Sequence, residues 1–233
     1  MTERGARIAS AAAIGLAVFL AVGCAAVSSP GVAPRPAPLP ANYADRVAAV
    51  ESVPSAAEIL TLTPEMVAYL DTYINERRHR PNQLRSLSRA LLHPGLLGIE
   101  YDSRRTGTAA ETFRTRTGNC MSLSILFVAM ARELGMDARF QQVEVMPEWE
   151  MEDDVLFTAR HVNVYGRLKG YGGYVMDFYP FPDEPRGRRK LLTDEQAIGQ
   201  FYNNLGARRL AAEDYAGAWV GIADTLGLMH AYG

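Results

Sequence analysis

The sequence predicts an α+β fold, in which helices come first and an antiparallel sheet follows. Apolar residues recur at helical spacing up to residue 95. An apolar run over 120–134 then begins after Asn119, a residue suited to cap a helix, and ends at Gly135, a residue suited to terminate one. From Ala138 onward, β-branched and aromatic residues dominate segments that flank a glycine-rich turn. We therefore expect a buried helix packed against a β-hairpin.

The composition is that of a globular protein with a leader and one domain of ordinary size. The chain has 233 residues, of which 48% are hydrophobic and 21% charged, and its formal net charge is −2. This charge gives no reason to expect a nucleic acid as a partner. The acidic segment 148–154 lacks the spaced Asp/Asn/Gly pattern of a calcium loop, and we interpret it as a solvated loop. We expect neither a metal nor a cofactor.

The first 24 residues have the parts of a secretory leader. Basic residues come first, and the apolar run 8–22 is short and rich in small residues compared with a transmembrane span. The run ends in the sequence LAVGC, which resembles a bacterial lipobox, where cleavage precedes lipid attachment to the cysteine. We therefore expect 1–24 to be a lipoprotein signal peptide and Cys24 to carry lipid. The alternative is an ordinary signal peptide that is cut nearby, with Cys24 lost or incidental.

Residues 25–42 are rich in Pro and Ala, and such segments are extended, semi-rigid spacers. We expect this segment to tether a domain to the membrane through the lipid on Cys24. Ala25 stands where Asp is associated with inner-membrane retention, so the resemblance to lipoproteins of diderm bacteria favours the outer membrane, facing the periplasm. The predicted location is thus the bacterial cell envelope, and Cys120 is left as the free thiol.

Helices are predicted within 43–95, the first part of a domain that we place at 43–192. Thr63, Pro64 and Glu65 have the pattern of an N-cap, a first-turn proline and a first-turn acid. A basic run over 77–80 ends this helix, and a second helix starts at Pro81. Within the remainder, 96–192, a loop and one short helix over 109–113 lead to the cysteine.

A hairpin is the clearest β signal in the chain. Its predicted strands are 155–168 and 173–179, joined by a turn over 169–172. His161 and Asp177 then lie on the same face, because each strand alternates its side chains. With the turn centred near Lys169, they are direct cross-strand partners, with Cβ atoms about 4.5–5.5 Å apart.

This pairing matters because a cysteine nucleophile needs a base and a group that orients the base. A helix N-terminus favours the thiolate form of Cys120, and an adjacent imidazole can take its proton. The backbone N–H of Cys120 could contribute to an oxyanion hole. Each residue also has a simpler explanation: Cys120 could be a small core residue, and His161 with Asp177 a surface ion pair. Taken together, the three residues indicate a catalytic site or its relic.

The chain here resembles the transglutaminase-like superfamily, in its bacterial cysteine-peptidase-like branch. The resemblance covers about 108–180 and is carried by Gly118-Asn119-Cys120, by 131–135 with 137–139, by 160–164 and by 175–177. It implies a papain-like fold, with a Cys-bearing helix packed on an antiparallel sheet that bears His and Asp. It implies Cys120, His161 and Asp177 as the catalytic residues. Val162 and Asn163 stand where many members carry aromatic residues. Members also draw a second oxyanion donor from an upstream side chain, for which this chain offers Tyr101 or Glu111.

The tail, 193–233, is predicted to be helical. Thr193 and Gln196 form a capping-box pattern, and the spacing of residues from Asn204 to Ala218 is similar to a single tetratricopeptide repeat. Two functions are consistent with the whole sequence. The first is an enzyme that cleaves or transfers an amide bond of a peptide or protein through a thioester, with hydrolysis preferred. The second is a non-catalytic scaffold whose tail binds a protein partner.

Overall fold

The computed structural model describes residues 53–74, 80–144, 149–152, 155–158, 161–179 and 187–232. All of these lie within the second of the chain's two compact units, 39–233. The predicted leader, Cys24, the tether and residues 43–52 of the predicted domain lie outside the described residues. Their assignments stay predictions.

Three helices open the described part: α2 (Ala56–Ile59), α3 (Pro64–Tyr73) and α4 (Arg80–Leu92). Thr63 caps α3, because its hydroxyl accepts a hydrogen bond from the backbone N–H of Met66, and Pro64 occupies the first turn, as predicted. The basic run does not end this helix. α3 stops at Tyr73, and Arg80 instead begins α4, one residue before the predicted start.

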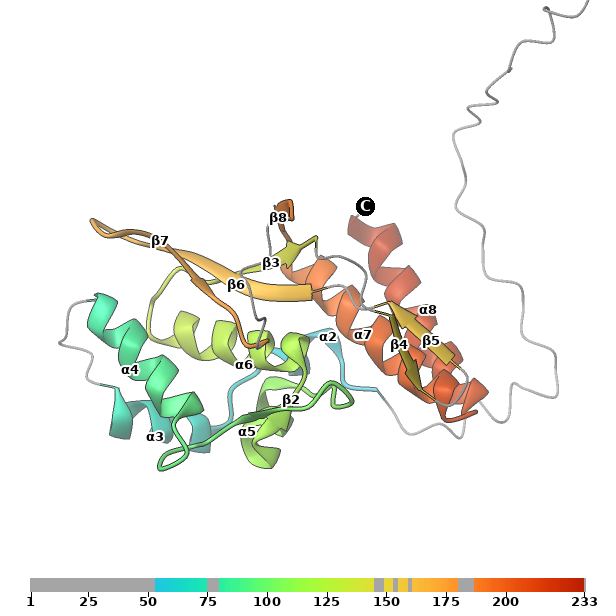
Figure 1. Ribbon diagram of the computed structural model, residues 1–233, viewed down its shortest axis with the longest axis horizontal. Coiled ribbons are helices and arrows are strands. Elements are labelled where there is room, and N and C mark those ends of the chain that lie inside the picture. Colours follow the sequence, from blue (N-terminus) through green and yellow to red (C-terminus); the bar gives the residue numbers. More distant parts are fainter. Residues whose placement is uncertain are drawn as a thin grey trace, which may run out of the picture. The chain divides into compact units, whose positions relative to one another are not determined.

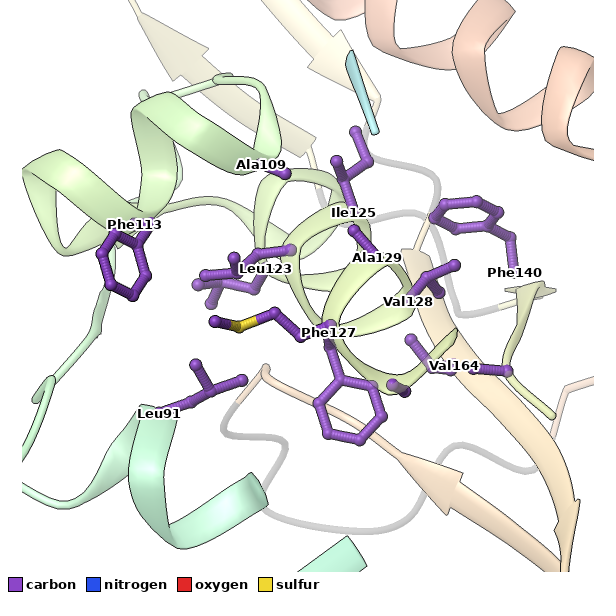
Figure 2. Packing of buried hydrophobic residues seen from close by; sticks show 14 of the residues in the cluster. Leu91, Ala109, Phe113, Leu123, Ile125, Phe127, Val128, Ala129, Phe140 and Val164 are labelled. Carbon is purple, nitrogen blue, oxygen red and sulfur yellow. The ribbon is translucent and has the colours of Figure 1, made fainter. Parts of the chain in front are cut away.

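The central element is α6 (Cys120–Glu133), which is preceded by α5 (Ala109–Thr115). Every residue of α6 from 121 to 131 is buried, so this helix has no solvent face over three turns. Figure 1 shows the sheet on one side of α6 and the helices α3, α4 and α5 on other sides. In the close-up of Figure 2, Phe127 and Val128 of α6 lie among Leu91 of α4, Phe140 and Val164. The apolar run in the sequence is thus explained by burial on all sides.

The main sheet has four antiparallel strands in the order β7-β6-β3-β8. These strands are β3 (Arg139–Val143), β6 (His161–Leu168), β7 (Gly172–Met176) and β8 (Arg189–Leu191). Phe140, Val162 and Val164 belong to the core cluster that also includes most of α6. The mixture of helices with an antiparallel sheet confirms the predicted α+β class. A short parallel pair, β1 (Glu100–Tyr101) with β2 (Thr117–Gly118), precedes α6 and was not predicted.

Two predictions about the β region are wrong. The first hairpin strand does not run from 155 to 168, because β5 (Val155–Thr158) pairs with β4 (Trp149–Glu152) in a separate two-stranded sheet. β6 begins only at His161. The acidic segment is not a simple loop either, since Glu150 and Glu152 lie within β4. Large apolar residues alternate with these two acids in the sequence, which is the period of a strand.

The tail forms two helices, α7 (Asp194–Ala211) and α8 (Tyr215–Tyr232), which pack against each other. The capping box at Thr193 and Gln196 is confirmed. α7 joins the main core: Phe201 is fully buried there, and the hydroxyl of Tyr202 donates a hydrogen bond to the carbonyl of Pro54. Arg132 of α6 forms a two-pronged ion pair with Asp194. Among the described helices, none combines the length and apolar character needed to cross a membrane.

Because α7 contributes to the same core as α6, truncating Phe201 should destabilise the whole unit. We expect Phe201→Ala to lower the free energy of unfolding by about 3–5 kcal/mol. Leu210→Ala, at an exposed position of the same helix, should change it by less than about 0.5 kcal/mol. Urea denaturation followed by circular dichroism measures both. A separate early transition for the tail, or equal effects of the two variants, would contradict the shared core.

Candidate active site

The start of α6 is fixed by a set of short-range hydrogen bonds. Asn119 is the N-cap: its side-chain oxygen accepts from the backbone N–H of Ser122 at 3.0 Å, as predicted. Cys120 is the first helical residue and is partly exposed. Its thiol therefore sits at the positive end of the α6 dipole, next to backbone N–H groups that have no partner within the helix.

The preceding loop is bound to this helix start. The carbonyl of Arg105 accepts hydrogen bonds from the backbone N–H of Asn119, at 2.8 Å, and from the hydroxyl of Ser122, at 3.1 Å. The same hydroxyl accepts from the N–H of Gly107 at 2.9 Å, and the amide of Asn119 donates to Thr106 at 2.8 Å. Ser122 is fully buried. These contacts hold the loop and the cysteine as one rigid element.

Gly118 lies where no side chain fits. A Cβ atom added to it would stand 2.6 Å from the Cβ of Ser122, which is inside van der Waals contact. Its φ is not in the left-handed region, so close approach rather than backbone conformation requires the glycine. The glycine before the cysteine thus has a packing reason.

His161 and Asp177 contact each other, although not as the direct cross-strand pair that we predicted. Val164 pairs with Met176, so Asn163 lies opposite Asp177 when the register is continued, and His161 lies opposite Tyr179. The turn is therefore centred one residue later than predicted, at Gly170, whose φ of 83° suits glycine. The two residues still share a face. The Nε2 atom of His161 reaches diagonally to both carboxylate oxygens of Asp177, at 2.8 Å each.

Burial and charge act in opposite directions on this pair. Burial lowers the pKa of His161, but the hydrogen bonds and charges of Asp177 and Cys120 outweigh it and raise the pKa to about 9. Burial raises the pKa of Asp177, but hydrogen bonds from His161, Asn163 and the N–H of Tyr179 outweigh it and hold the pKa below its usual value. The imidazole is therefore a cation at neutral pH, beside an ionised carboxylate.

These shifts link the pair to stability. The raised pKa of His161 adds to the free energy of unfolding. This contribution is complete below the unfolded-state pKa of 6.5 and is lost as pH rises through about 9. The lowered pKa of Asp177 also adds to the free energy of unfolding. This contribution is complete above the unfolded-state pKa of 3.8 and is lost as pH falls through the pKa of Asp177 in the folded state. Both contributions are complete between about pH 3.8 and 6.5.

His161 also interacts with Cys120 through a hydrogen bond. Because Nε2 is engaged by Asp177, Nδ1 is the ring nitrogen that meets the thiol. The ring is largely buried, and the edge of Tyr179 packs against it with centroids 5.9 Å apart. The structure thus brings together the three residues that the sequence nominated, as a chain of contacts from Cys120 through His161 to Asp177.

Residues 89–178 match the family model described as the transglutaminase-like superfamily. The matched stretch is similar to the transglutaminase-like superfamily. It spans Cys120, His161 and Asp177, and it starts within α4 and ends just after β7. No curated protein and no solved structure matches the chain. Within the described residues, no group of His, Cys, Asp and Glu side chains could hold a metal ion.

Of the two upstream side chains considered as oxyanion donors, Glu111 is otherwise engaged. Its carboxylate accepts from the N–H of Thr108 in the capping box of α5, so it acts as a helix cap. Tyr101 instead packs edge-on against Tyr179 at 5.2 Å, and Tyr179 packs against His161. Asn163 and Tyr179, which hold Asp177, were not nominated from the sequence as site residues. For Asn163 the sequence held one signal, which is that this residue shares a strand face with His161.

The titration of His161 can be measured directly. We expect its imidazole signals in NMR to titrate with a midpoint of about pH 9. In Asp177→Asn the midpoint should fall, because burial remains while the hydrogen bond to the carboxylate and its charge are removed. Asp194→Asn, which alters the carboxylate paired with Arg132, should leave the midpoint unchanged. An unchanged midpoint in Asp177→Asn would refute the proposed electrostatic coupling.

Gly118→Ala should displace the first turn of α6, because the added methyl group overlaps Ser122. We expect a loss of about 1–3 kcal/mol in the free energy of unfolding, together with slower alkylation of Cys120. The matched control is Gly199→Ala in α7, where an added Cβ meets nothing within 4 Å. A Gly118→Ala variant as stable and as reactive as the control variant would show that the contact is not tight.

Proposed function

We propose that this protein is a cysteine-dependent enzyme that acts on amide bonds of a peptide or protein. In this proposal Cys120 is the nucleophile, His161 is the base and then the acid, and Asp177 orients His161. One observation carries it: His161 contacts Cys120 and Asp177 at once, beside a capped helix N-terminus. The transglutaminase-like domain at 89–178 supports cysteine-based chemistry in general.

In the proposed reaction the imidazole of His161 takes the proton of the Cys120 thiol, and the raised pKa of His161 favours holding that proton. The thiolate attacks the carbonyl carbon, and the carbonyl oxygen takes the negative charge. In this proposal the backbone N–H of Cys120 stabilises the oxyanion. Collapse of the intermediate breaks the C–N bond, and His161 donates its proton to the leaving amine. A water molecule then attacks the thioester, with His161 as its base, and releases the acid and the thiol.

We favour hydrolysis of a peptide or isopeptide bond over transfer to an amine. The predicted lipid on Cys24 and the tether over 25–42 would place the domain in the cell envelope, with the outer membrane facing the periplasm as the expected site. Its substrate would then be an envelope peptide or protein. The proposed reaction needs no cofactor, since the chain itself supplies nucleophile, base and orienting carboxylate.

A second candidate function is a scaffold that binds a protein partner through the helical tail. The observation that favours it is a set of large apolar side chains left exposed on α7 and α8, which comprises Leu210, Tyr215 and Ile222. In that case the contact of His161 with Asp177 would be a structural relic. Loss of a co-purifying protein when Leu210, Tyr215 and Ile222 are replaced with Ser, which leaves the core intact, together with no reactive thiol in the wild type, would favour the scaffold.

Reactivity of the thiol separates these candidates. We expect iodoacetamide to modify Cys120 at pH 7 faster than a free thiol, because the imidazolium stabilises the thiolate. His161→Ala should slow the modification roughly tenfold or more, since an ordinary thiol is only a few per cent ionised at this pH. His93→Ala, an exposed histidine in a turn, is the control. Peptide mapping by mass spectrometry locates the label. A Cys120 that reacts no faster than free cysteine would refute the enzyme.

Turnover needs a second measurement. We expect a library of peptides and cell-wall fragments to contain an amide that the wild-type protein cleaves and the Cys120→Ala variant does not. The cleaved fragments, identified by mass, would define the bond. Equal product from both proteins would assign the cleavage to a contaminant.

A further inference from the structure

The carboxylate of Asp177 is held from two sides. The backbone N–H of Tyr179 donates to Oδ1 at 3.1 Å, and the side-chain amide of Asn163 donates to Oδ2 at 2.9 Å. Between these two donors, the Nε2 atom of His161 lies 2.8 Å from both oxygens. Rotation about the terminal bond of Asp177 would break at least one of the outer hydrogen bonds. The backbone donor is fixed by the chain, so Asn163 is the side chain on which the orientation depends.

Asn163 occupies the position that His161 was expected to have. Continuing the register of β6 with β7 places Asn163 directly opposite Asp177, whereas His161 reaches the carboxylate along the diagonal. Direct cross-strand partners are the closest pairs on a sheet face. Asn163 can therefore reach Asp177 with its short side chain. The imidazole of His161 still reaches the same carboxylate from its diagonal position.

The burial of Asn163 costs free energy at one of its two polar atoms. Its side chain is 2% exposed, and among the described residues its Oδ1 atom is one of the buried polar atoms without a hydrogen-bond partner. A buried amide oxygen that lacks a partner costs free energy. An apolar residue of similar size would avoid this cost. We therefore look for the role of the Asn163 side chain in its other polar atom, Nδ2. That atom donates to Asp177.

We propose that Asn163 is a positioning residue, which holds the Asp177 carboxylate in the orientation that steers His161. The inference rests on the proposed function, because steering matters only if His161 transfers protons. Asn163 acts through Asp177, whose lowered pKa agrees with a donor at this position. The titratable groups set against Asp177 are His161 and, through it, Cys120.

The test replaces Asn163 with Leu, which keeps the approximate volume and removes the donor. Asn163→Asp keeps the shape and replaces the donor with a second carboxylate. The matched control is Gln141→Leu: Gln141 pairs with Asn163 across β3 and β6, is also buried and also carries an unpartnered amide oxygen. Measurements on the full-length protein are the carboxyl titration of Asp177 by ¹³C NMR, the melting temperature, and the hydrolysis of p-nitrophenyl acetate across pH.

We expect Asn163→Leu to raise the titration midpoint of Asp177 and, because the lowered pKa of Asp177 contributes to stability, to lower the melting temperature at neutral pH by no more than that shift accounts for. Hydrolysis should fall roughly 10-fold to 100-fold at neutral pH, as for the loss of one hydrogen bond to a charged group. The acid limb of its pH profile should also move to higher pH. Asn163→Asp should raise the midpoint further, because two carboxylates then adjoin. Gln141→Leu should leave the midpoint and the profile as in the wild type.

An Asp177 midpoint that is the same in Asn163→Leu and wild type would overturn the proposal. So would a fall in melting temperature in Asn163→Leu that stays the same at pH values below the titration of Asp177, since the amide would then serve packing and not the ionised carboxylate. The titration and the melting curve need no turnover. If the wild-type protein fails to hydrolyse the ester while the midpoint still shifts, the proposed enzyme fails and the role of Asn163 in orienting Asp177 stands.

Discussion

The burial of α6 on all sides constrains everything around the candidate site. A helix without a solvent face can neither slide nor rotate unless several layers move with it. The buried hydroxyl of Ser122 bonds the loop at Arg105, and the hydroxyl of Ser124 donates to the carbonyl of Val162, next to His161. The relation between Cys120 and His161 is therefore determined by helix–strand packing. A site built in this way is rigid before any substrate binds.

The features that could be predicted from sequence are those with local causes. Thr63, Asn119 and Thr193 cap their helices because a side-chain oxygen near a free N–H suffices, whatever the rest of the chain does. Gly135 ends α6 with a positive φ for an equally local reason. The common face of His161 and Asp177 follows from the alternation of strands alone. These signals were enough to select the three candidate residues.

Other features depend on contacts distant in the sequence or on the geometry of one turn. A shift of one residue in the turn centre moved Asn163 into the position opposite Asp177, and no periodicity distinguishes the two registers because both keep the same face. The separation of β5 from β6 depends on pairing with β4, which competes with a continuous strand. The pairing of β1 with β2 joins short segments across an intervening helix, so neither segment carries a recognisable strand pattern.

The contribution of α7 to the core has a consequence for the order in which the chain is made. Synthesis proceeds from the N-terminus, and Cys120 emerges long before Phe201 and Tyr202. Until those residues arrive, the core around α6 lacks one wall, and the carbonyl of Pro54 lacks the hydroxyl that it accepts in the finished fold. The unfinished chain thus carries its thiol, and later His161 and Asp177 as well, before the core is closed. Completion of the last helices is what converts an ordinary cysteine into an organised site.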